Sequence, residues 1–70
     1  MQPIPAQEMV SLVHTKGIEA AIERSRMIAS NQGTEFSNKD ALYEIILAAK
    51  HADCPMLAAA ACVMYEKETN

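Results

Sequence analysis

Apolar side chains recur at helical spacing along most of this chain. The segment 18–31 shows this most clearly, because its apolar or small residues follow the i, i+3, i+4, i+7 rule and its charged residues fall on the opposite side. The apolar side comprises Ile18, Ala21, Ile22, Ser25, Ile28 and Ala29. The charged side includes Glu19, Glu23, Arg24 and Arg26. This pattern predicts an amphipathic helix with one buried face.

Three further helices are predicted at about residues 5–15, 38–52 and 55–67. No alternating strand pattern occurs in the sequence. We therefore predict an all-α fold, a single domain over residues 1–70 built as a small bundle of three to four short helices. The number of helices depends on Gly17, which either separates the first two helices or bends one long helix. We favour separation.

Residues typical of helix ends lie between the predicted helices. Gly33 can adopt the left-handed conformation that ends many helices. Ser37 and Asp40 resemble a capping box, with aspartate in place of the usual glutamate or glutamine. Pro55 suits the first turn of a helix, where its missing N–H would have had no partner. These signals support the predicted boundaries.

The last predicted helix is apolar on nearly all sides. Its central segment, Met56–Tyr65, contains four consecutive alanines, and alanine has the highest intrinsic helix propensity. A helix without a polar face is buried in a large protein or a membrane, or is covered by a partner. The run is too short for a bilayer, which requires about 20 residues. We therefore expect another protein chain to cover it.

The size of the chain also favours association. With 70 residues, including one Phe, two Tyr and no Trp, the chain can build only a small core. Small domains often gain stability from oligomerisation. We expect a homodimer in which the last two helices pack across a seam. The expected seam residues are Leu42, Ile46, Ala49, Leu57, Ala60 and Met64. A monomeric bundle and an obligatory complex with a different protein are the two alternatives.

A nucleic-acid-binding regulator is the second functional hypothesis. The two short helices around Gly17 superficially resemble a helix-turn-helix, and the basic residues Lys16, Arg24 and Arg26 lie near one another in the sequence. Against this, a recognition helix beginning at residue 18 would carry Glu19 and Glu23, and the net charge of −3 opposes binding to phosphate.

Catalytic, metal and cofactor sites are not expected. The sequence has no Gly-rich phosphate loop and no H-E-x-x-H motif. His14, His51, Cys54 and Cys62 are residue types that bind zinc, but they lack paired ligand spacing. The two cysteines are too far apart along one helix for a disulfide, which indicates a reducing compartment. Cys54, beside a helix N-terminus, could have a redox role, but no C-x-x-C partner accompanies it.

The sequence thus favours a small non-enzymatic interaction module, self-associating and acting as a regulator or adaptor. Its first residues lack the basic and apolar regions of a signal peptide, so we expect a cytoplasmic protein without membrane attachment.

Overall fold

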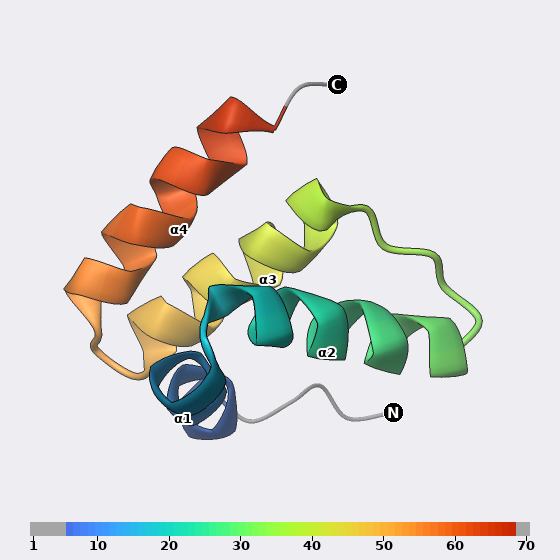
Figure 1. Ribbon diagram of the computed structural model, residues 1–70, viewed down its shortest axis with the longest axis horizontal. Coiled ribbons are helices and arrows are strands. Elements are labelled where there is room, and N and C mark those ends of the chain that lie inside the picture. The colour runs from blue at the N-terminus through green and yellow to red at the C-terminus, as the bar shows by residue number, and fades with distance from the viewer. Residues whose placement is uncertain (1–5, 69–70) are drawn as a thin grey trace.

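Four helices account for most of the chain in the computed structural model, which describes residues 6–68 (Figure 1). They are α1 (Ala6–Lys16), α2 (Ile18–Asn31), α3 (Asn38–His51) and α4 (Pro55–Lys67). No strand occurs within the described residues. The all-α prediction is therefore confirmed, with helix boundaries within about one residue of those expected. Residue 5, the predicted start of the first helix, lies outside the described residues.

Gly17 separates α1 from α2. Its φ of 95° and ψ of 165° lie in a region of backbone space that is essentially restricted to glycine. The last turn of α1 closes onto this residue, because the Gly17 N–H donates to the Val13 carbonyl at 2.9 Å. The chain then turns, and α2 begins at the next residue in a different direction (Figure 1). The separate-helix interpretation is confirmed.

Replacing Gly17 with alanine is expected to destabilise the protein by about 1–3 kcal/mol, because a β-carbon disfavours this backbone conformation. No atom lies within 4 Å of the position that the new β-carbon would occupy, so the cost arises in the backbone itself. Urea unfolding followed by circular dichroism measures it. An unchanged unfolding midpoint would show that the turn can adopt another conformation without cost.

The ends of α2 and α3 share one hydrogen-bonding pattern, the Schellman motif. After α2, the Gly33 N–H donates to the Ser30 carbonyl and the Thr34 N–H donates to the Ala29 carbonyl. After α3, the N–H groups of residues 53 and 54 donate to carbonyls at the corresponding positions of the last turn. Gly33 takes the positive φ in the first motif, as predicted from the sequence.

Asp53 takes the positive φ in the second motif, with φ of 56°, a conformation that costs most L-residues energy. This turn was not predicted from the sequence. We expect Asp53→Gly to raise the free energy of unfolding by about 0.5–1 kcal/mol, since glycine adopts this conformation without a β-carbon penalty. Asp53→Ala serves as the control and should lower stability. A Gly variant less stable than the wild type would indicate that the carboxylate itself stabilises the turn.

The start of α3 is held by the predicted capping box. The Asp40 N–H donates to Ser37 Oγ at 3.2 Å, and the Ser37 N–H donates to Asp40 Oδ2 at 3.1 Å. Two N–H groups that a helix terminus would otherwise leave unpaired are satisfied.

Helix α3 is central to the core, because α1, α2 and α4 all pack against it (Figure 1). Its Leu42 and Ile45 are the largest side chains with no exposed surface. Small residues allow the helices to approach closely: Ala21, Ala41, Ala49 and Ala61 are each 0% exposed. Met9 from α1 and Leu57 from α4 belong to the same buried core.

Candidate functional site

Helix α4 has one main packing partner in the fold. It packs along α3 as the second arm of a helical hairpin and makes at most a slight contact with α1 or α2 (Figure 1). At the far end of this hairpin the rings of Tyr43 and Tyr65 lie 6.4 Å apart, centroid to centroid. The covered side of α4 is narrow, with Leu57 and Ala61 as its buried residues.

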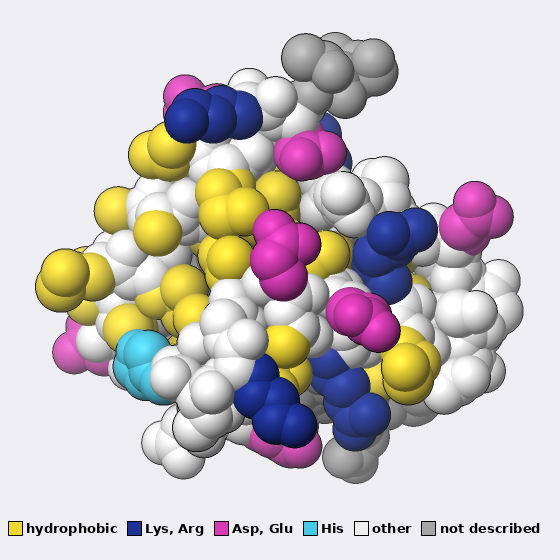
Figure 2. All heavy atoms as spheres, in the orientation of Figure 1, with side chains coloured by type: hydrophobic (Ala, Val, Ile, Leu, Met, Phe, Trp, Pro, Cys, Tyr) yellow, Lys and Arg dark blue, Asp and Glu magenta, His cyan; other side chains and the backbone are white. Residues whose placement is uncertain are grey.

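The opposite side of α4 carries exposed apolar residues. We define the outer face of α4 as Met56, Ala59, Ala60 and Val63. Met56 is 85% exposed and Val63 is 53% exposed. These residues are spaced by three and four positions, so they form one continuous stripe along the helix. Hydrophobic side chains gather over α4 and its crevice with α3, while most charged side chains lie elsewhere on this face of the molecule (Figure 2).

The structure places the six expected seam residues in different environments. Four of them, Leu42, Ile46, Ala49 and Leu57, are at most 8% exposed and belong to the hydrophobic core of the single chain. They are unavailable to a second chain in this conformation. Met64 is half-buried against the same core, and Ala60 alone is exposed. Only Ala60 thus belongs to the outer face of α4.

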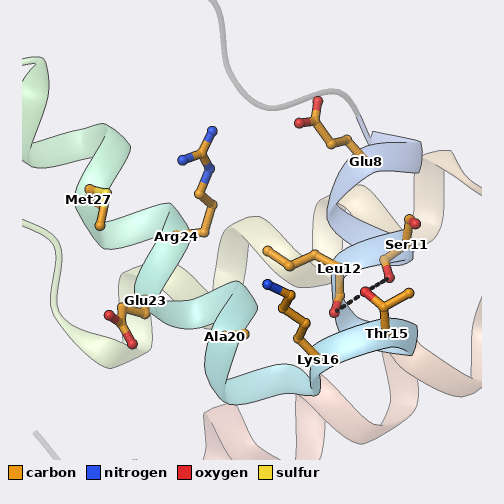
Figure 3. Close-up of a pocket in the computed structure, with 9 residues that line it drawn as sticks. All are labelled: Glu8, Ser11, Leu12, Thr15, Lys16, Ala20, Glu23, Arg24 and Met27. Atoms are coloured by element: carbon orange, nitrogen blue, oxygen red, sulfur yellow. Dashed lines mark hydrogen bonds between the residues drawn. The ribbon is translucent and has the colours of Figure 1, made fainter.

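An open groove of about 620 Å³ lies between α1 and α2 (Figure 3). Leu12, Ala20 and Met27 provide apolar surface, and Lys16 and Arg24 extend along it, as Figure 3 shows. Glu8 and Glu23 also line the groove, so its formal charges balance. Its hydroxyl Thr15 Oγ1 lies 2.9 Å from the Ser11 carbonyl, to which it donates a hydrogen bond within α1.

Arg26 does not join Lys16 and Arg24 in this groove, contrary to the expected cluster of three basic residues. Two positions along a helix turn the side chain by about 200°, which directs Arg26 away from Arg24. Arg26 instead donates from Nε to the Phe36 carbonyl and from Nη1 to Asn38 Oδ1, both at 3.1 Å. It therefore ties α2 to the loop that precedes α3.

We expect Arg26→Ala to lower the free energy of unfolding by about 1 kcal/mol, because it removes two hydrogen bonds from a charged but exposed donor. Arg24→Ala is the matched control, because Arg24 lies on a different side of the same helix. It should change the free energy of unfolding by less than about 0.5 kcal/mol. Chemical denaturation of both variants tests this. Equal effects would show that the Arg26 hydrogen bonds do not stabilise the loop.

The two cysteines considered for metal binding and redox chemistry are not joined to each other. Cys54 and Cys62 are both free thiols, and each is partly buried on α4 or at its start. Within residues 6–68, no group of three or more His, Cys, Asp or Glu side chains is arranged to hold a metal ion. No buried side-chain nitrogen or oxygen in this part of the chain lacks a hydrogen-bond partner. None of the helices described has both the length and the apolar character needed to cross a bilayer.

Comparisons of the chain with family models, with curated proteins and with solved structures find no match in any of the three. The residues and their geometry therefore provide the argument for function.

Proposed function

We propose that this protein is a non-enzymatic protein–protein interaction module that binds through the outer face of α4. The observation that carries the proposal is the exposure of Met56 and Val63 on a helix packed along only one other helix. Burying such side chains would contribute about 25 cal/mol per Å² of apolar surface. Methionine adapts well to a partner surface because its side chain is unbranched and flexible.

A regulator or adaptor role is consistent with this surface, because such proteins act by binding. Nucleic-acid binding is a weaker candidate. Of the three basic residues assigned to it, Arg26 bonds within the chain, and Lys16 and Arg24 share their groove with two glutamates. A phosphate backbone would meet no net positive charge there.

Photo-crosslinking in the native cells tests the proposal. Val63 is replaced by a photoreactive amino acid in one variant, and the exposed Ser30 of α2 is replaced in a control. We expect a discrete higher-mass protein adduct from position 63 only, lost when Met56→Glu is added. No adduct at position 63, or the same adducts from both positions, would contradict the proposal. An adduct with a second copy of the chain and an adduct with a different protein would both support the proposal.

A further inference from the structure

We infer that a small cavity between α1, α2 and α3 binds a primary alkylammonium group. The cavity has a volume of about 90 Å³, and no residue of α4 lines it. It is separate from the outer face of α4, so the inference does not rest on the proposed function. Two polar side chains without partners, the charges around the cavity and its size support the inference.

Ser25 supplies a buried hydroxyl that has no partner. Ser25 is 6% exposed, lies in the middle of α2 and lines the cavity. A hydroxyl within a helix often donates to a carbonyl of the preceding turn, as Thr15 does to Ser11. The Ser25 hydroxyl forms neither this bond nor any other with the part of the chain that the structure describes. Every side-chain oxygen that is fully enclosed there has a partner, so the Ser25 oxygen is not fully enclosed and opens onto the cavity.

Glu44 supplies a negative charge without a cation. It is half-buried on α3 and lines the same cavity. Its carboxylate forms neither an ion pair nor a hydrogen bond with the residues that the structure describes. No basic residue lies three or four positions away on α3 to interact with it along the helix. Partial burial removes water from the carboxylate, so a ligand with a positive charge and N–H donors is stabilised there.

The charges around the cavity also favour a cation. No basic residue lines the cavity. Arg26, which donates to the Phe36 carbonyl, lines an adjoining groove that shares Phe36 with the cavity. Three glutamates line this groove as well, namely Glu19, Glu23 and Glu35. The positive charge of Arg26 is therefore outweighed, and the potential on this side attracts cations.

The wall of the cavity matches an ammonium on an alkyl chain. An ammonium has three N–H donors, and three side chains with acceptor oxygens line the cavity: Ser25, Gln32 and Glu44. At about 30 Å³ for each water-sized group, the cavity holds roughly an ammonium and two methylene groups. The other lining residues are apolar and would contact these methylene groups: Met9, Ile28, Ala29, Phe36 and Ala48.

A metal ion fits this wall less well than an ammonium. Calcium takes about six or more oxygen ligands, and magnesium requires a near-ideal octahedron. The cavity has a single carboxylate, that of Glu44, and its wall is mostly apolar. The donor set therefore favours an organic cation.

A titration followed by two-dimensional nuclear magnetic resonance tests the inference. The probe is butylammonium chloride, added to the labelled protein in phosphate buffer, which contains no competing amine. Two compounds are matched controls: n-butanol has the same shape without the charge, and butyltrimethylammonium has the charge without N–H donors. We expect saturable shifts of the backbone signals of Ser25, Ala29 and Ala48 with butylammonium only, and a millimolar dissociation constant for so small a ligand. No saturable shift with butylammonium, or equal shifts with either control, would overturn the inference.

Charge removal at Glu44 tests the assigned carboxylate. Glu44→Gln keeps the shape of the side chain and should weaken butylammonium binding by about tenfold, because the charge-assisted hydrogen bond is lost. Glu23→Gln is the matched control, since Glu23 is exposed on α2 and does not line the cavity. It should leave the dissociation constant within about twofold of the wild type. Equal losses in both variants would overturn the site.

Ser25→Ala separates a hydroxyl that binds a ligand from one that stabilises the fold. We expect a melting temperature at least as high as that of the wild type, because the variant loses an unpartnered hydroxyl and gains helix propensity. Its affinity for butylammonium should fall by about fivefold. Ser30→Ala, at an exposed position of the same helix, should leave the affinity unchanged. A lower melting temperature with unchanged affinity would overturn the role of Ser25.

The source of the ammonium is distinguished by a second probe. Nα-acetyl-lysine methylamide has the same ammonium group on a peptide backbone. Shifts with this compound as well as with butylammonium would identify a lysine side chain of another protein as the ligand. Shifts with butylammonium alone would identify a free small amine. Both results support the site.

Discussion

Ala61→Glu is expected to unfold most of the protein, whereas Ala60→Glu leaves it folded. The two alanines are adjacent in α4, and the same substitution changes helix propensity by the same few tenths of a kcal/mol. Ala61 is 0% exposed against α3, while Ala60 lies on the outer face. A glutamate at position 61 must either bury an unpaired charge, at a cost of several kcal/mol, or separate the two helices.

The total stability explains the size of this effect. A chain of 70 residues has a free energy of unfolding of about 4–10 kcal/mol at 0.05–0.15 kcal/mol per residue. The cost at position 61 is comparable to this total. Circular dichroism at 222 nm with a thermal scan separates the two variants. If Ala60→Glu unfolds the protein as well, the outer face is not a free surface.

The Ala60→Glu variant also tests whether the protein binds through the outer face of α4. Because position 60 lies on the outer face of α4, an added charge there should prevent association while the helical signal stays unchanged. If the folded variant still associates at the same protein concentration as the wild type, the contact does not lie on the outer face of α4.

The helix boundaries could be predicted because their causes are local. Gly17, Gly33 and the capping box at Ser37 each act within a few residues of chain, so their effect can be recognised without knowing the fold. Asp53 was missed although its turn is equally local. A left-handed Asp carries a much weaker sequence signal than a glycine, and only the Schellman hydrogen bonds reveal its role.

The outer face of α4, which we propose as the binding surface, could be predicted from the sequence only in part. Lacking a polar face, α4 gives no periodic signal to show which side meets α3. Ala60 and Ala61 have the same chemistry, and only the packed structure distinguishes the exposed residue from the buried one. The seam expected from the sequence therefore combined residues of the intrachain core with a residue of the outer face.

Arg26 illustrates the same limit for polar residues. Its partners are 10 and 12 positions away in the sequence, beyond the reach of any helical pattern. The sequence placed it on the charged side of α2, which is correct, but not in contact with the loop. Helical periodicity predicts the face of a residue, and tertiary structure determines what that residue contacts.

Leu42→Ala is expected to lower the free energy of unfolding by about 3–5 kcal/mol, because Leu42 is 0% exposed at the centre of α3 and the substitution leaves a cavity. Leu47→Ala is the matched control on the same helix. Leu47 is 37% exposed, so its truncation should cost about 1 kcal/mol. In a domain of this size 1 kcal/mol corresponds to about 4–8 °C, and the melting temperatures should differ by more than about 10 °C. Equal melting temperatures would mean that α3 is not the centre of the core.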